Sequence, residues 1–153
     1  MELGTITREI FVDASPTVVF DVVSSPDHLK EWWPDDAHYE PTPGSAGHIV
    51  FGDRNAGGTV VPFTVVEARP PETFSFRWTH PAEEVAAEGN SLLVTFELTP
   101  ARGGTLLKMT ETGFREMGWE VALLEQQYNE HVTGWDFYLP RLAPYVATLH
   151  VRP

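Results

Sequence analysis

Apolar positions recur with helical spacing through the last third of the chain. From residue 119 to about residue 149 they fall three or four positions apart, and one histidine lies in the same stripe: Leu124, Tyr128, His131, Trp135, Tyr138 or Leu139, Leu142 and Val146. This spacing is close to the 3.6-residue period of a helix with one buried face. The sequence therefore predicts one long amphipathic helix whose inward face mixes aromatic and polar groups.

Seven shorter segments before this helix alternate apolar and polar residues, which is typical of β-strands. They cover residues 5–12, 37–40, 48–51, 59–68, 73–79, 91–99 and 105–112. Turn-forming residues separate most of them. Among these turns, the run Asn-Ala-Gly-Gly at residues 55–58 is predicted to be a hairpin turn rather than a phosphate loop, since no Gly-Lys-Ser/Thr follows.

Each predicted strand has one polar and one apolar face. Phe74, Phe76 and Trp78 alternate with polar residues, and Met109 shares a face with Glu111 two positions later. Such strands suit an antiparallel sheet with a single covered side. We therefore predict an α+β protein in which the long helix covers the sheet. A single helix laid on a curved sheet is expected to leave a pocket for a small molecule.

Two short helices are predicted between the first and second strands. Ser15 can cap the first helix and Pro16 suits its first turn, and Ser25-Pro26 begins the second helix in the same way. The second helix runs to Trp32-Trp33 and stops at Pro34. Because two helices this short cannot form a bundle, we expect them to close one end of the sheet.

Four segments of the chain resemble a known superfamily. They are residues 8–33, residues 66–78, residues 104–114, and the group Gly134-Trp135, Leu139, Leu142 and Tyr145. Together they are similar to the START-like, or SRPBCC, superfamily, and most similar to its heat-shock protein 90 ATPase activator homologue-like family. The resemblance implies a single helix-grip (START-like) domain over residues 1–153. Such a domain has a curved antiparallel sheet of about six to seven strands gripping a long C-terminal helix, with two short helices after the first strand.

Composition and charge narrow the functional classes. The chain has 153 residues, no cysteine and a formal net charge of −12. The absence of cysteine excludes disulfides, thiolate metal sites and cysteine nucleophiles. The acidity disfavours nucleic-acid binding, because nucleic acid is itself densely negative. No apolar run approaches the roughly 20 residues of a membrane-spanning helix, and no secretory signal opens the chain, so we expect a cytoplasmic protein without membrane insertion.

Candidate ligand-binding residues follow from the strand faces and from the helix stripe. Pocket walls are expected from Phe51, Phe63, Trp78, Phe96, Met109, Phe114 and Trp135, and polar anchors from Glu111, Tyr128 and His131. Gly134 adds to this picture, because a glycine inside a helix costs roughly 1 kcal/mol relative to alanine. Close approach of a strand, a side chain or a ligand would explain it.

Glu111 is the sharpest polar candidate. Its strand position turns it inward, where it could orient a ligand hydroxyl or act as a general acid or base. Alternatively, it bonds to the following turn or lies exposed at the rim. His131 can both donate and accept hydrogen bonds, which suits either the anchoring of an apolar ligand or a satisfied core histidine. Tyr128, three residues earlier, either shares this site or directs its hydroxyl to water.

Metal and nucleophile chemistry have weaker support. The six histidines are scattered, and no helical His-x-x-x-His or His-Glu-x-x-His spacing occurs, so no metal and no cofactor are predicted. No Gly-x-Ser-x-Gly nucleophile motif is present either.

The leading prediction is a cofactor-free domain that binds a small hydrophobic or aromatic molecule between the sheet and the long helix, with binding alone favoured over catalysis. The resemblance leaves two further classes open, because its members include polyketide cyclases and co-chaperone-like domains. An enzyme would cyclise or dehydrate a substrate in the same cavity, using Glu111 with His131 or Tyr128. A protein-interaction module would bind a chaperone or another protein, and a second copy of the chain is a further candidate partner.

Overall fold

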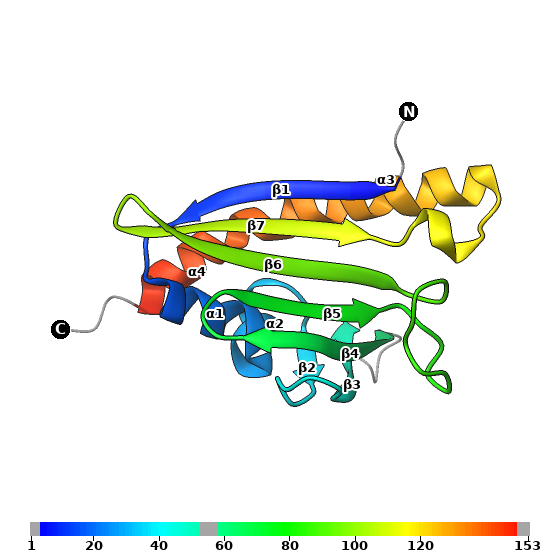
Figure 1. Ribbon diagram of the computed structural model, residues 1–153, viewed down its shortest axis with the longest axis horizontal. Helices are drawn as coiled ribbons and strands as arrows, with labels where there is room; N and C mark the ends of the chain where they lie inside the picture. Colours follow the sequence, from blue (N-terminus) through cyan, green and yellow to red (C-terminus); the bar gives the residue numbers. More distant parts are fainter. Residues whose placement is uncertain (1–3, 53–57, 150–153) are drawn as a thin grey trace.

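A seven-stranded antiparallel sheet forms the body of the computed structural model, which describes residues 4–52 and 58–149. The strands are β1 (Thr5–Val12), β2 (Asp36–His38), β3 (Ala46–Phe51), β4 (Thr59–Arg69), β5 (Thr73–Trp78), β6 (Leu92–Ala101) and β7 (Gly104–Thr112). Their order in the sheet is β1-β7-β6-β5-β4-β3-β2 (Figure 1). The predicted hairpin turn at residues 55–58 lies, apart from its last residue, outside the described residues.

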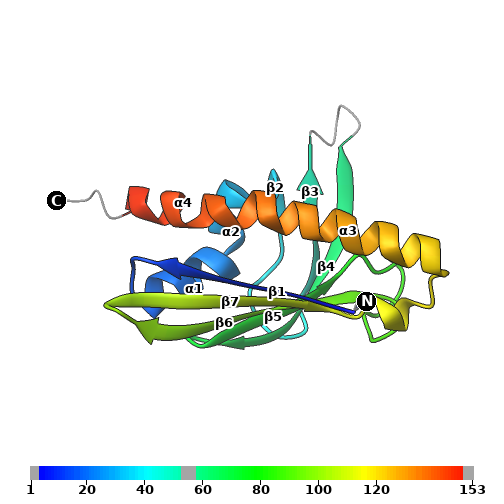
Figure 2. The ribbon, with the colours of Figure 1, turned by 90° about the horizontal axis from the view of Figure 1, so that it is seen from above.

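The sheet is curved toward the side on which the C-terminal helices lie. Figure 2 shows β3 and β4 leaving the plane of β1, β7 and β6 in that direction. A register shift between Val65 and Glu67 interrupts the pairing of β4 with β5. A bulge of this kind bends a strand and increases its twist. The curvature leaves room for a helix against the concave face.

Two short helices follow β1, as the sequence predicts. They are α1 (Pro16–Ser24) and α2 (Pro26–Trp32), each with a proline in its first turn. The Ser15 hydroxyl accepts a hydrogen bond from the Val18 N–H at 3.3 Å, which caps α1. Ser25 makes no such side-chain bond at the start of α2. Both helices lie on the concave side of the sheet (Figure 2).

The predicted long helix is present as α3 (Val121–Tyr138) and α4 (Leu142–Leu149), joined by a 3-10 turn, η3 (Leu139–Arg141). It begins two residues later than predicted, because the Glu120 carboxylate accepts the Ala122 N–H at 3.0 Å and caps it there. The turn contains Pro140, which has no N–H for the preceding turn of a helix. Among the described residues, no helix is long and apolar enough to cross a membrane.

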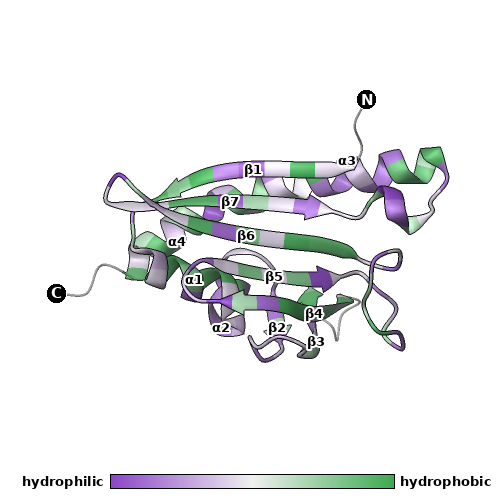
Figure 3. Cartoon of the chain, viewed as in Figure 1, coloured by the Kyte–Doolittle hydropathy of each residue, from purple (hydrophilic) through white to green (hydrophobic). Residues whose placement is uncertain are grey.

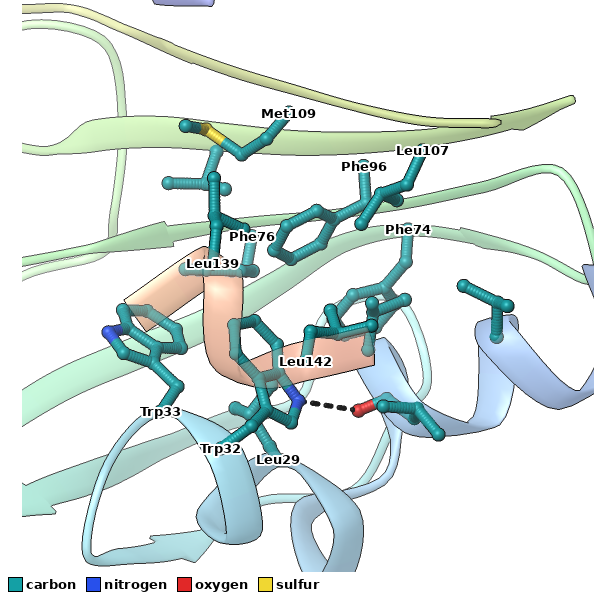
Figure 4. Packing of buried hydrophobic residues seen from close by; sticks show 14 of the residues in the cluster. Leu29, Trp32, Trp33, Phe74, Phe76, Phe96, Leu107, Met109, Leu139 and Leu142 are labelled. Atoms are coloured by element: carbon teal, nitrogen blue, oxygen red, sulfur yellow. Dashed lines mark hydrogen bonds between the residues drawn. The ribbon is translucent and has the colours of Figure 1, made fainter. Parts of the chain in front are cut away.

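The hydrophobic core lies between the concave face of the sheet and the helices. The apolar faces predicted for the strands are buried, and Figure 3 shows the alternation of hydrophobic and hydrophilic positions along them. Figure 4 shows Leu139 and Leu142 packed among aromatic residues of the sheet and of α2. The Trp32 indole donates to the Val22 carbonyl at 3.1 Å. These features confirm the α+β helix-grip fold.

The strand β5 departs from the expected pattern of one wet and one dry face. On β5 the outward-facing Thr73 and Ser75 are also buried, at 8% and 4% exposure. Ser75 lies in register between Glu67 and Thr95, and the Arg69 guanidinium donates to the Thr73 hydroxyl at 3.3 Å. The longer neighbouring side chains therefore cover these two small hydroxyls.

Candidate functional site

A carboxylate lies wholly buried on the concave face of the sheet. Glu111 of β7 pairs in register with Ile6 of β1 and Val94 of β6, and its side chain is 0% exposed. Of the positions predicted for Glu111, the inward-facing one is therefore the one observed. A carboxylate in such surroundings is costly unless it is hydrogen-bonded.

Three N–H groups converge on the Glu111 carboxylate. The Trp78 indole donates to Oε2 at 2.8 Å, and the Trp135 indole donates to Oε1 at 2.7 Å. Nδ1 of His131 lies 3.0 Å from both oxygens. An indole nitrogen can only donate, so each carboxylate oxygen accepts at least one bond from a tryptophan.

The geometry assigns the imidazole proton that faces Glu111. Nδ1 of His131 is equally distant from the two carboxylate oxygens, which is the arrangement of one N–H shared between two acceptors. A protonated carboxyl group would instead direct an O–H from one oxygen. From this hydrogen-bond pattern we assign a proton to Nδ1. Nε2 is then the ring nitrogen that makes no contact with Glu111.

Elements far apart in the sequence bring these four side chains together. Trp78 ends β5, whereas His131 and Trp135 lie one turn apart on α3. The imidazole of His131 packs edge-to-face against Phe114 and Trp78, with ring centroids 5.4 and 5.3 Å apart. Phe114 is placed by the turn at Gly113, whose φ of +108° favours glycine.

Two polar contacts tie α3 to the edge strand β1. The Tyr128 hydroxyl donates to the Thr5 carbonyl at 2.9 Å, and the Arg8 guanidinium donates to Asp136 at 2.8 Å. The hydrogen bond from Arg8 lowers the pKa of the Asp136 carboxyl, and the same contact raises the pKa of Arg8. These contacts fix the position of α3 above the sheet on either side of His131.

A pocket of about 440 Å³ opens beside the buried carboxylate. It lies between α3 and the strands β3 and β5, and it is lined by Trp33, Phe51, Trp78, Glu130, His131, Gly134, Trp135 and Tyr138. A Cβ built at Gly134 would meet no atom within 4 Å. No strand or side chain of the described residues therefore approaches Gly134 closely, so neither of these two explanations accounts for the glycine.

Trp33 stands at the centre of the aromatic wall. It caps the C-terminal end of α2, and its ring centroid lies 5.0 Å from those of both Trp78 and Trp135. Phe51 and Phe76 complete its surroundings at 6.0 and 5.7 Å. Trp33, at the end of α2, thus joins residues of β3, β5 and α3 in one aromatic wall at the back of the pocket.

The structure divides the ten predicted site residues into three groups. Four of them line the pocket, namely Phe51, Trp78, His131 and Trp135. Glu111, Phe114 and Tyr128 stand behind it, in contact with His131 or with each other. The other three, Phe63, Phe96 and Met109, are buried in the core and do not border this pocket, because aromatic and helix side chains fill the space around them.

Four lining residues were not among the predicted site residues. Gly134 and Tyr138 fell within the helix pattern, and Trp33 directly follows the last residue of α2. Glu130 is exposed at the pocket rim. The helical stripe already placed Tyr138 with His131 and Trp135, and Gly134 was noted beside them, but neither was named as a site residue.

Two larger hollows lie elsewhere on the described surface. One of about 810 Å³ lies beside β3 and β4 and is lined largely by residues 80–86, most of which are exposed. The other, of about 620 Å³, lies between the start of α1 and α4. Neither is lined by tryptophan or borders the buried carboxylate, so the smaller pocket combines apolar walls with a directed polar group.

Histidines near the sheet edge do not build a metal centre in the described part of the chain. The rings of His38 and His48 lie 4.9 Å apart, and Nε2 of His38 bonds to Asp36 at 2.9 Å. Within residues 4–52 and 58–149, no group of three or more potential ligand side chains is arranged to hold a metal ion.

Fold and site together define a helix-grip protein with an aromatic pocket against its C-terminal helix. Residues 13–147 match the family model described as Activator of Hsp90 ATPase homolog 1-like protein, and the chain therefore belongs to this family. The resemblance found in the sequence is confirmed. Among curated proteins, none matches the chain.

Solved structures share this architecture at low sequence identity. MLL2253 from Mesorhizobium loti is 22% identical, with a TM-score of 0.73 over 94% of this chain and 97% of that chain. The Aha1 dimer from Colwellia psychrerythraea is 19% identical, with a TM-score of 0.66 over 93% and 95% of the two chains. DynU16, a protein of the dynemicin biosynthetic locus, is 22% identical, with a TM-score of 0.67 over 95% of this chain and 48% of its own. These similarities establish the fold.

Proposed function

We propose that the protein binds a small, uncharged aromatic or hydrophobic molecule in the pocket between α3 and the sheet. The observation that carries the proposal is the aromatic wall of Trp33, Trp78 and Trp135 facing the open space at Gly134. A volume of about 440 Å³ is within the range of small-molecule sites. Flat aromatic walls of this kind suit a flat ligand.

The charge around the pocket disfavours an anionic ligand. Glu130 lies at the rim, Glu111 lies behind the wall, and the whole chain carries a net charge of −12. An anion entering the pocket would meet repulsion from these carboxylates at close range. The charge therefore argues against an anionic ligand, and the largely apolar aromatic walls support a neutral one.

A binding screen with a blocked pocket tests this proposal. Aromatic compounds, including flavonoids and polyketide-like ring systems, are added while the melting temperature is measured. A ligand present at 100 times its Kd adds about 2.7 kcal/mol of stability, or roughly 5–10 °C for a chain of this size. Gly134→Leu should abolish the shift, because its side chain enters the pocket.

The matched control is Ala122→Leu, which adds the same side chain to an exposed position near the start of α3. It should bind like the wild type. If no compound raises the melting temperature, or if Gly134→Leu binds as well as Ala122→Leu, the protein does not use this pocket.

A second candidate is a proton-transfer enzyme, such as a polyketide cyclase or dehydratase, and the Glu111–His131 pair favours it. A histidine whose Nδ1–H is held by a carboxylate has Nε2 free to accept a proton, as a general base does. Deuterium uptake at the methyl group of 2-acetylnaphthalene in heavy water, followed by NMR, tests this chemistry. An enzyme is supported if the wild type exchanges the methyl protons faster than buffer alone does and His131→Leu does not. Exchange at the buffer rate in the presence of the wild type would count against an enzyme.

A chaperone partner and a homodimer are two further proposals, supported by the family description and by the Aha1 dimer of the same fold. The ATPase rate of a purified bacterial Hsp90, with and without this protein, tests the first. The molar mass measured by light scattering, as the protein elutes from a size-exclusion column, tests the homodimer. A cytoplasmic location stays a proposal, which fractionation of the host cell would check.

A further inference from the structure

We propose that the pocket selects ligands that donate a hydrogen bond, namely aromatic compounds carrying a hydroxyl group, through Nε2 of His131. This proposal rests on the proposed binding function and names its ligand class. It depends on a relay of two hydrogen bonds, from the ligand to the imidazole and from the imidazole to Glu111. Glu111 itself is shielded from the pocket and acts as a positioning residue.

Nε2 of His131 is the nitrogen available to a ligand. Nδ1 is engaged by both oxygens of Glu111, whereas Nε2 has no hydrogen-bond partner among the described residues and is not a fully buried atom. The side chain of His131 is 13% exposed and lines the pocket. A neutral imidazole that donates from Nδ1 presents a lone pair at Nε2, and the proposal takes His131 in this neutral form. The ring therefore offers the pocket an acceptor rather than a donor.

Glu111 fixes this polarity. Its two oxygens are also held by the indoles of Trp78 and Trp135, so the carboxylate cannot turn away from the imidazole. The Phe114 and Trp78 rings confine the imidazole on its sides. A flipped ring would lose the bond to Glu111. Carboxylate, indoles and ring packing thus hold the acceptor lone pair in one direction.

The remaining walls explain why the donor should belong to an aromatic molecule. Apart from His131 and Glu130, the pocket is lined by aromatic side chains and by the open position at Gly134. A phenolic hydroxyl is uncharged and donates strongly, which satisfies Nε2 without bringing a negative charge near Glu111 and Glu130. A carboxylate ligand would bring a charge and no donor.

The test compares three naphthalene probes by isothermal titration calorimetry. 2-Naphthol donates a hydrogen bond, 2-methoxynaphthalene has the same ring but only an acceptor, and 2-naphthoate is an anion. The wild type should bind 2-naphthol about five- to tenfold more tightly than 2-methoxynaphthalene, which is the range of one neutral hydrogen bond. 2-Naphthoate should bind most weakly.

Two variants separate recognition from folding. His131→Leu should bind the two neutral probes with equal affinity, whereas His38→Leu, which removes a half-exposed histidine on β2, should keep the wild-type preference. Glu111→Gln should lose or reverse the preference, because an amide N–H facing Nδ1 moves the imidazole proton to Nε2. A mere structural role of Glu111 would weaken all probes equally and leave their ratio unchanged.

The outcomes distinguish the two proposals. Equal binding of 2-naphthol and 2-methoxynaphthalene by the wild type would overturn the selectivity while leaving the binding function intact. Preference for 2-naphthoate would overturn it as well, since it would mean that Nε2 carries a proton. Binding of none of the probes, together with no hit in the wider screen, would overturn the binding function itself.

Discussion

The hydrogen bonds to Glu111 make a quantitative prediction about stability. Glu111→Gln keeps the shape of the side chain but replaces one acceptor oxygen with an NH₂ group. In the wild type, each oxygen of Glu111 accepts an indole N–H, one from Trp78 and the other from Trp135. In the variant, one buried indole N–H must therefore face another donor.

The cost follows from the burial of the groups involved. Trp135 is 2% exposed and Trp78 is 8% exposed, so water cannot replace the lost acceptor at either indole. An unsatisfied buried donor costs about 1–3 kcal/mol. We expect a loss of about 2 kcal/mol in the free energy of unfolding, or a melting temperature lower by roughly 4–8 °C.

A double-mutant cycle identifies the source of this loss. Trp135→Phe removes the indole N–H that bonds to Oε1 of Glu111. In the double variant, the amide NH₂ of the introduced glutamine can take this position without facing another donor. The double variant should therefore be about 1–2 kcal/mol more stable than the sum of the two single losses predicts. Urea unfolding of the four proteins measures this coupling. Strict additivity would refute the assignment of three donors to one carboxylate.

Three further predictions concern single positions. Gly134→Ala should raise the melting temperature by about 2–4 °C in a thermal scan, because alanine favours the helix by roughly 1 kcal/mol and its Cβ meets no atom; a lower value would mean that the space is filled. Asp136→Asn should be less stable than the wild type by at most about 1 kcal/mol near neutral pH, because this pair with Arg8 is exposed. Since the pKa of Asp136 is lowered, that difference is present above the ordinary aspartate value of 3.8 and disappears as the pH falls below it, which denaturant unfolding at each pH can follow. Tyr39→Phe should cost about 1 kcal/mol in urea unfolding, because the buried Tyr39 hydroxyl donates to the Ser24 carbonyl at 2.6 Å, and an unchanged midpoint would contradict this.

The fold could be predicted because nearly every element leaves a local pattern. Strand alternation placed Phe74, Phe76 and Trp78 on one face, and all three are buried. The strand and helix ends differ from the predicted ones by one or two residues. They differ where a local interaction decides the end, such as the Glu120 cap of α3. The 3-10 turn at Pro140 interrupts the C-terminal helix, and the stripe of apolar positions continues across it with little change.

The site could be predicted only in part, because its contacts join distant segments. Alternation directed Glu111 inward and helical spacing directed His131 and Trp135 toward it, but neither pattern shows which groups will meet. The bond from Trp78 to Glu111 spans 33 residues and depends on the register of three strands. Trp33 was not named as a site residue, since it follows α2 at a position where no period predicts a direction. The sequence also could not predict how deeply each residue is buried. Residues on one strand face share a direction, and only packing decides which of them border open space.

The buried carboxylate is best explained by its position beside the pocket. An apolar side chain at position 111 would avoid the desolvation of a carboxylate, and replacing buried ionic groups in this way is often neutral or stabilising. Stability alone therefore gives little reason for Glu111. Its bonds to His131 and Trp135 hold one turn of α3 against the sheet at the place where the helix is otherwise only half-buried. They also fix the proton on the imidazole that lines the pocket. Glu111 thus both anchors the helix and sets the polarity of a pocket wall, which is the arrangement that the proposed binding function requires.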